Sequence, residues 1–322
     1  MSLSVRDTLE RFQIPIYFSA ILAAAVLSVL APVAPASERA IDPALALMLF
    51  VTFLQVPLAE LMRTFAHLRF LATLLIGNFL LVPLVVAALF PFLPADPLIR
   101  LGVLLVLLTP CIDYVVTFSH LGGADARLLL AATPALLLAQ MLLLPVYLGL
   151  FLGEAAAEIM QWGPFLQAFA WLIAGPLALA ALVQAWAARS TAGIRVARRL
   201  SLLPVPATAA VLFIIVATVM PQLDAARGAA LRVVPVYAAF AVAAPCIGWG
   251  VARLLGLAAP AGRAAAFSTG TRNSLVVLPL ALSIPGAIPV LPAVIVAQTM
   301  VELIGELAYI RLIRRLGRTR AA

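Results

Sequence analysis

The sequence contains no lysine and is poor in charged residues of either sign. Charged residues make up 11% of the chain, against about 25% in an ordinary soluble domain. Hydrophobic residues make up 65%, and a soluble protein of 322 residues could not bury that much apolar surface. The composition excludes a soluble globular protein and predicts an integral membrane protein surrounded by the lipid bilayer.

Cysteine and the usual catalytic motifs are also scarce. The two cysteines, Cys111 and Cys246, both lie within apolar runs, so a disulfide framework is excluded. The sequence has no glycine-rich phosphate loop, no zinc-type spacing of cysteine and histidine, and no Ser-His-Asp arrangement. We therefore predict a protein without enzymatic activity, resident metal or cofactor. The sequence leaves open whether a separate ATPase subunit joins it.

The positive charge of the chain is carried by arginine alone. A net charge of +8 could indicate a nucleic-acid partner. Nearly all of the arginines, however, lie in short loops between apolar runs and in the C-terminal tail. Arginines placed in this way set the orientation of a membrane protein, so no nucleic-acid partner is predicted.

Ten apolar runs are long enough to cross a bilayer, which takes roughly 20 residues. They are residues 14–34, 44–62, 68–92, 98–119, 127–152, 164–187, 203–222, 230–256, 261–284 and 288–312. With the N-terminus in the cytoplasm, sixteen arginines fall on the cytoplasmic side and four on the opposite side. This asymmetry predicts a multi-pass protein with both termini cytoplasmic. The abundance of alanine and arginine indicates a bacterial protein, so we expect the plasma (inner) membrane of a bacterium.

An even division of the ten segments gives two halves of five. An odd number of segments per half forces the halves into opposite orientations, which is the inverted-repeat arrangement of many transporters. We predict one membrane transporter domain over residues 1–322, with a first repeat at about 14–152 and a second at about 164–312. A basic linker at about 188–202 interrupts the second repeat after its first helix.

Polar residues interrupt the fourth and ninth apolar segments, which hold corresponding places in the two halves. The first break covers residues 109–113 and the second covers residues 268–274. Irregular backbone is tolerated at membrane depth where it lines a cavity, and matched breaks in two repeats indicate the binding site of a transporter. The predicted substrate-binding residues are Thr109, Cys111, Asp113, Arg272 and Asn273.

Three of these residues admit two interpretations. Asp113 and Arg272 carry opposite charges at the two breaks. They could form a buried ion pair that holds the breaks together, or substrate or a coupling cation could compete for that pair. Cys111 follows Pro110, so it is either a small buried hydrophobic side chain or a ligand at an unwound position.

Two acidic residues lie in the tenth segment. Glu302 and Glu306 are four residues apart, so they share one helix face at about 6 Å along the axis. Two carboxylates in low dielectric cannot both be ionised cheaply. We expect one of them to exchange a proton during transport. Glu302 is the better candidate because it lies farther from the arginine-rich tail, and Glu306 is expected to modulate it.

Three stretches resemble a known family. They are residues 110–125 in segment four, 270–279 in segment nine and 298–302 in segment ten. All three resemble the bile acid:sodium symporter superfamily, and the chain looks most like its arsenical-resistance permease branch. The resemblance implies a panel domain from segments 1, 2, 6 and 7. It also implies a core domain from segments 3, 4, 5, 8, 9 and 10, in which the broken segments 4 and 9 cross.

The resemblance also implies a function. In arsenite permeases a cysteine of segment four and a glutamate of segment ten act together, and these positions match Cys111 and Glu302. The leading hypothesis is proton-coupled efflux of a trivalent metalloid, because thiolate is the ligand that a soft centre prefers. The alternative is sodium-coupled symport of an organic anion, with Arg272 holding the carboxylate and Asp113 helping to hold sodium. The coupling ion is therefore H+ or Na+.

Overall fold

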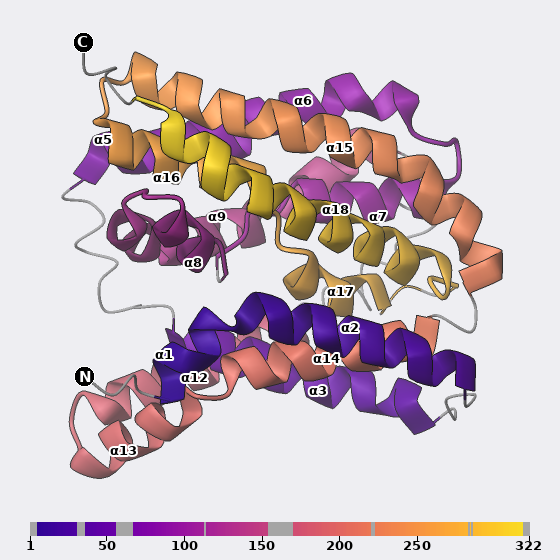
Figure 1. The fold of residues 1–322 in the computed structure, drawn as a ribbon, viewed down its shortest axis with the longest axis horizontal. Coiled ribbons are helices and arrows are strands. Elements are labelled where there is room, and N and C mark those ends of the chain that lie inside the picture. The colour runs from indigo at the N-terminus through magenta and orange to yellow at the C-terminus, as the bar shows by residue number, and fades with distance from the viewer. Residues whose placement is uncertain are drawn as a thin grey trace. The chain divides into compact units, whose positions relative to one another are not determined.

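The computed structural model describes residues 5–30, 36–55, 67–112, 114–153, 170–219, 223–282, 284 and 286–317. The regular structure of these residues is helical (Figure 1). Their one β-type pairing is an isolated bridge between Pro110 and Arg272. The prediction of an all-α protein is confirmed for the described part of the chain.

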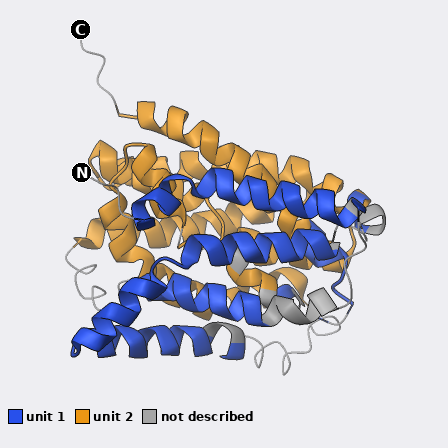
Figure 2. Ribbon diagram, turned by 60° about the horizontal axis from the view of Figure 1, so that its bottom comes forward, with its two compact units in different colours: residues 1–55, 161–227, 279–293 blue, residues 56–160, 228–278, 294–322 orange. Residues whose placement is uncertain are grey.

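The contacts between residues divide the chain into two compact units (Figure 2). Unit 1 comprises residues 1–55, 161–227 and 279–293, and unit 2 comprises residues 56–160, 228–278 and 294–322. The predicted segments 1, 6 and 7 and most of segment 2 fall in unit 1. Most of segments 3, 4, 5, 8, 9 and 10 falls in unit 2. This is the grouping of segments that the resemblance assigns to panel and core.

Unit 1 is a bundle of helices that pack on one another. Its described elements are α1 (Val5–Arg11), α2 (Gln13–Leu30), α3 (Ala36–Gln55), the π-helical turn η5 (Ala170–Ala174), α12 (Gly175–Ala187), α13 (Thr191–Leu200) and α14 (Pro204–Val219). Helix α14 packs against α2 and α3, and α12 packs against α3 and α13. Gln184 joins α12 to α3, because its Nε2 donates to the carbonyl oxygen of Leu54 at 3.2 Å.

The hydrophilic stretch predicted as a linker at about 188–202 is largely helical, as α13. Ser190 is its N-cap and accepts a hydrogen bond from a backbone amide of the first turn at 3.2 Å. Arg198 and Arg199 lie in its last turn, where cations are stabilised by the negative end of the helix dipole. Favourable residues at both ends therefore make this connection a helix.

Unit 2 contains the elements of both predicted breaks. They are α5 (Leu68–Ile76), the π-helical turn η3 (Gly77–Leu81), α6 (Val82–Leu89), the 3-10 turn η4 (Phe90–Phe92), α7 (Pro97–Leu107), α8 (Tyr114–Leu121), α9 (Ala126–Leu152), α15 (Leu223–Leu254), α16 (Ala259–Gly270), α17 (Ser274–Leu282), α18 (Val290–Leu312) and η7 (Ile313–Arg315). One end of α15, of α17 and of α18 belongs to unit 1. Asp96 and Asp125 cap α7 and α9, each by accepting from backbone amides of the first turn.

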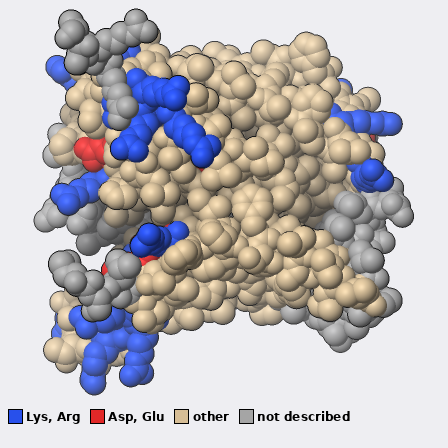
Figure 3. Space-filling model, in the orientation of Figure 1, with Lys and Arg blue, Asp and Glu red and all other residues tan. Residues whose placement is uncertain are grey.

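Arginine side chains gather at one end of unit 2. Figure 3 shows a large group of them over the carboxyl ends of α15 and α18 and a smaller group at the opposite end of this face, while the middle carries no charge. Arg263 at the start of α16 donates to the carbonyl oxygens of Leu316 at 2.9 Å and of Gly123 at 3.0 Å. These bonds join three loops that the charge pattern assigns to the same side of the membrane. Which side that is remains a prediction.

The predicted membrane segments are represented by helices of different lengths. Among the described residues, five helices are long and apolar enough to span a bilayer: Leu68–Phe92, Ala126–Leu152, Thr191–Thr218, Ala226–Leu254 and Val290–Arg315. Val5–Arg11 and Gln13–Ser28 together form a sixth, bent by 64°. Segments 2, 4, 6 and 9 contain shorter or interrupted helices. A multi-pass membrane protein is supported, and ten spans in two inverted repeats stay a prediction.

The close approach of α15 to α16 yields a test of the packing in unit 2. A Cβ added at Gly248 would lie 2.2 Å from Thr269 Oγ1 and 2.5 Å from the carbonyl oxygen of Ala265, whereas one added at Gly250 would meet nothing within 4 Å. We expect Gly248→Ala to lower the free energy of unfolding by about 1–3 kcal/mol. The matched control Gly250→Ala should be neutral or stabilise by up to about 1 kcal/mol, because it removes a glycine from a helix interior. Thermal unfolding of the two purified variants measures the difference, and equal midpoints would contradict the packing.

Candidate functional site

The two predicted helix breaks lie together in unit 2. Helix α7 ends at Leu107 and α8 begins at Tyr114, while α16 ends at Gly270 and α17 begins at Ser274. Between them the two chain segments run antiparallel, bridged at Pro110 and Arg272. We call this arrangement the crossing; it comprises residues 108–112 and 271–273. The prediction that both segments are broken is confirmed.

Backbone groups freed by one break are satisfied by the other. The amide nitrogen of Cys111 donates to the carbonyl oxygen of Thr271 at 3.0 Å, and that of Asn273 donates to the carbonyl oxygen of Thr109 at 2.9 Å. An unpaired amide or carbonyl costs several kcal/mol in hydrocarbon, on the order of a lost hydrogen bond in an apolar medium. Each interrupted helix therefore supplies the hydrogen-bonding partners that the other needs.

Arg272 lies at the centre of the crossing and is completely buried. Its Nη1 donates to the carbonyl oxygen of Leu107 at 3.3 Å. Its Nη2 lies within 2.7–2.8 Å of the carbonyl oxygens of Ser268 and Thr269 and of Asn78 Oδ1. The guanidinium thus meets the carboxyl ends of α7 and α16, where unpaired carbonyls concentrate negative charge.

Two neighbours complete the surroundings of this guanidinium. The ring of Phe240 on α15 lies 5.4 Å from it, in a cation–π arrangement. Asn78 occupies the π-helical turn η3, and its Nδ2 donates to Ser268 Oγ at 3.0 Å and to the carbonyl oxygen of Leu74 at 3.1 Å. The structure therefore places Asn78 against the second break.

Glu302 is held by three donors. Its Oε2 accepts from the backbone nitrogen of Arg272 and from Gln298 Nε2, each at 2.6 Å, and its Oε1 accepts from the hydroxyl of Tyr114. Gln298 is oriented in turn by Ser274, whose hydroxyl donates to Gln298 Oε1 at 2.9 Å. The side chain of Glu302 is 3% exposed, so these bonds replace its solvation. The carboxylate anchors α18 to the crossing.

Glu306, one turn later on α18, is less well satisfied. It is completely buried, and its Oε1 forms a hydrogen bond with the hydroxyl of Thr271. Its Oε2 has no hydrogen-bond partner among the described residues. The two acids that the sequence placed on one helix face therefore differ in their surroundings.

The remaining predicted site residues are placed as follows. Thr109 and Cys111 are buried on the first segment of the crossing, residues 108–112, and Asn273 is buried on the second, residues 271–273. Thr109 Oγ1 bonds back to the carbonyl oxygen of Leu105 at 2.9 Å, and Asn273 Oδ1 accepts from the amide of Val276 at 3.4 Å. Asp113 lies outside the described residues, so its ion pair with Arg272 stays a prediction.

Two residues that hold Glu302 against the crossing were missed by the sequence analysis. Tyr114 reaches both Glu302 and the carbonyl oxygen of Arg272, the latter at 3.3 Å, and Gln298 links Ser274 to Glu302. Tyr114 follows the first break directly, and Gln298 lies one turn before Glu302. Those positions are the signals that could have identified them.

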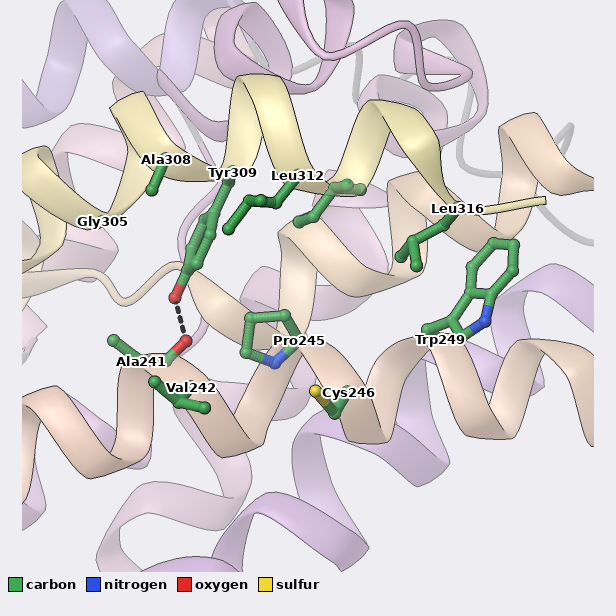
Figure 4. A pocket seen from close by; sticks show the side chains of 11 residues that line it. Ala241, Val242, Pro245, Cys246, Trp249, Gly305, Ala308, Tyr309, Leu312 and Leu316 are labelled. Atoms are coloured by element: carbon green, nitrogen blue, oxygen red, sulfur yellow. Dashed lines mark hydrogen bonds between the residues drawn. The ribbon is translucent and has the colours of Figure 1, made fainter. Parts of the chain in front are cut away.

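Cys246 belongs to a different part of unit 2. It lines an almost wholly apolar groove of about 390 Å³ between α15 and α18 (Figure 4). Pro245 has no amide hydrogen, so the carbonyl of Ala241 lacks its helical donor. The hydroxyl of Tyr309 on α18 donates to this carbonyl across the groove. Cys246 is exposed on α15, whereas Cys111 is buried.

Arg272 provides a stability test of the crossing. Arg272→Lys keeps the charge but offers a compact ammonium in place of the planar fork that reaches both helix ends. We expect it to lower the free energy of unfolding by about 3–5 kcal/mol, the cost of breaking a buried charged network. The control Arg232→Lys, on an exposed position of α15, should stay within about 0.5 kcal/mol of the parent. Thermal unfolding in detergent compares them, and a stable Arg272→Lys protein would show that the fork is not required.

Comparison with known proteins supplies the family. No curated protein matches the chain. The model of the sodium bile acid symporter family matches residues 42–226, which is more than half of the chain. The matched region includes the first break and ends before the second. This is a family of transporters, and the protein described above, with its two broken helices paired in unit 2, belongs to the sodium bile acid symporter family.

Proposed function

We propose that the protein is a secondary transporter that exports a trivalent metalloid, arsenite or antimonite, in exchange for protons. The observation that carries the proposal is the position of Cys111. This buried cysteine lies on the crossing, and its backbone amide bonds to Thr271, the residue whose side chain meets Glu306. Thiol and acid are thereby linked through one residue of the second break.

The number of soft ligands suits a site that must release its substrate. Thiolate is the ligand preferred by soft centres, and the described residues contain no group of three His, Cys, Asp or Glu side chains that could chelate a metal ion. One thiol ligand binds a metalloid less tightly than three would. A substrate bound through Cys111 could therefore leave when the site opens to the other side.

The surroundings of Arg272 favour this proposal over sodium-coupled symport of an organic anion. The oxygens that converge at the breaks, from Leu107, Ser268 and Thr269, accept hydrogen bonds from the guanidinium. Carbonyl oxygens are also the ligands that a hard cation needs, so a sodium ion at this point would have to displace Arg272. Both terminal nitrogens of the guanidinium are already bonded, to three carbonyl oxygens and to Asn78, so a carboxylate docking on them would have to replace these bonds.

The wider architecture of the proposal follows from the family and the units. We propose that unit 2 is the core domain that carries the site and unit 1 is the panel domain. The ten segments form two inverted repeats within the plasma membrane of a bacterium, with both termini in the cytoplasm. Neither a nucleic acid nor a resident cofactor takes part, and the partners are the substrate and the bilayer.

A pair of cysteine variants tests the thiol. We expect Cys111→Ser to abolish uptake of arsenite into everted membrane vesicles, because a hydroxyl is a poor ligand for a soft centre. The matched control Cys246→Ser, which changes the second cysteine of the chain, should retain nearly full transport.

Two results would overturn this proposal. Equal arsenite uptake by the Cys111→Ser variant and the parent would exclude a thiol ligand. Uptake of an organic anion that requires a sodium gradient, without response to a pH gradient, would establish the symporter alternative instead.

A further inference from the structure

The hydroxyl of Thr271 has two oxygen neighbours but only one hydrogen. Thr271 Oγ1 lies 2.7 Å from the carbonyl oxygen of Phe267 and also within hydrogen-bond distance of Glu306 Oε1. A hydroxyl donates a single hydrogen bond and accepts others. The Phe267 carbonyl has no hydrogen to give, so one of the two contacts is bonded only if Glu306 supplies the second hydrogen.

From this count of hydrogens we propose that Glu306 binds the exchanged proton and that Glu302 stays ionised as an anchor. In the proposed state Glu306 donates through Oε1 to Thr271, and Thr271 donates to the Phe267 carbonyl. Sequence analysis had favoured Glu302 for the proton. The proposal deepens the proposed function and rests on it only for the link between this proton and metalloid export.

The second oxygen of Glu306 supports the same state. Oε2 is buried and has no hydrogen-bond partner among the described residues. An ionised carboxylate with an unsolvated, unbonded oxygen is far more costly than a neutral acid in the same place. A protonated Glu306 leaves only a carbonyl oxygen without a partner.

The partners of Glu302 donate hydrogens to it and do not require one from it. Two of its three donors, the amide of Arg272 and Nε2 of Gln298, are N–H groups that cannot accept a hydrogen from it through those atoms. The third, Tyr114, lies 3.3 Å from the carbonyl oxygen of Arg272. A distance of 3.3 Å is long for an O–H···O hydrogen bond, whereas Thr271 Oγ1 lies 2.7 Å from the Phe267 carbonyl oxygen. The hydroxyl hydrogen of Tyr114 is therefore donated to Glu302.

The charges around α18 are consistent with one ionised acid and one neutral acid. Among the described residues, Glu302 and Tyr309 on α18 face Glu306, and Arg272 and Cys246 face Tyr309 from the second break and from α15. Arg272 is the permanent cation of this set, and Glu302 balances it. A second buried anion at Glu306 would be uncompensated by any described cation. Loss of its proton would therefore disturb the Thr271 contact, and with it the second break.

Infrared spectroscopy of the full-length protein in liposomes tests the proton directly and needs no metalloid. At pH 7 we expect a carbonyl stretch from a buried, protonated carboxylic acid. The band should disappear in Glu306→Gln, remain in Glu302→Gln and shift in Glu306→Asp, which keeps an acid if the amide variant folds poorly. A band that survives Glu306→Gln, or one lost in Glu302→Gln, would overturn the proposal.

Transport measurements test the link to the break. Thr271→Val should reduce pH-gradient-driven arsenite uptake about tenfold or more, the equivalent of one lost hydrogen bond to an ionisable group. Thr271→Ser keeps the hydroxyl and should restore it. Equal rates for the two variants would show that the hydroxyl does not position the proton. A parent protein that takes up no arsenite would refute metalloid export while leaving the infrared result unchanged, so the two proposals fail separately.

Discussion

The buried guanidinium of Arg272 is the constraint on which the rest of unit 2 depends. Two apolar segments are interrupted where they lie against one another, and in an apolar environment each interruption leaves carbonyls that water cannot reach. The guanidinium meets the ends of both helices at once, and the backbone bonds of the crossing satisfy the remaining groups. A permanent buried cation requires an anion nearby. Glu302 is that anion, and its carboxylate is held in place by a hydrogen bond from the backbone amide of Arg272.

In this arrangement Glu302 and Glu306 have different roles, although both are glutamates on the same helix. Glu302 is surrounded by donors, so its charge is stabilised and its position fixed. Glu306 has one hydroxyl contact and an oxygen without a partner in the described part of the chain, so its charge is costly. Burial is the same for both, and the count of hydrogen-bond donors separates an anchoring carboxylate from a proton carrier.

Much of this site could be predicted from the sequence, and the limits have a physical origin. The breaks at 109–113 and 268–274 were visible because polar residues cluster there beside proline or glycine, and such clusters within apolar runs are costly in a bilayer. The acid pair of α18 followed from helical spacing alone. The contact of Tyr114 with Glu302 joins residues 188 positions apart, and no local pattern reports such a pairing. The sequence also could not show that Arg272 would be directed at carbonyls, because a charged residue at a break is equally compatible with an ion pair.

The bond between Tyr309 and Ala241 limits how α15 and α18 can move. Pro245 leaves the Ala241 carbonyl without a helical donor, and Tyr309 is the group that satisfies it. If either helix slid along the other, that carbonyl would be left bare in an apolar groove. The bond joins the middle of α15 to the last turn of α18, so a rearrangement that opens the crossing without breaking this bond moves these two parts together. Bending is directed to the unwound loops of the breaks, where backbone groups can exchange partners.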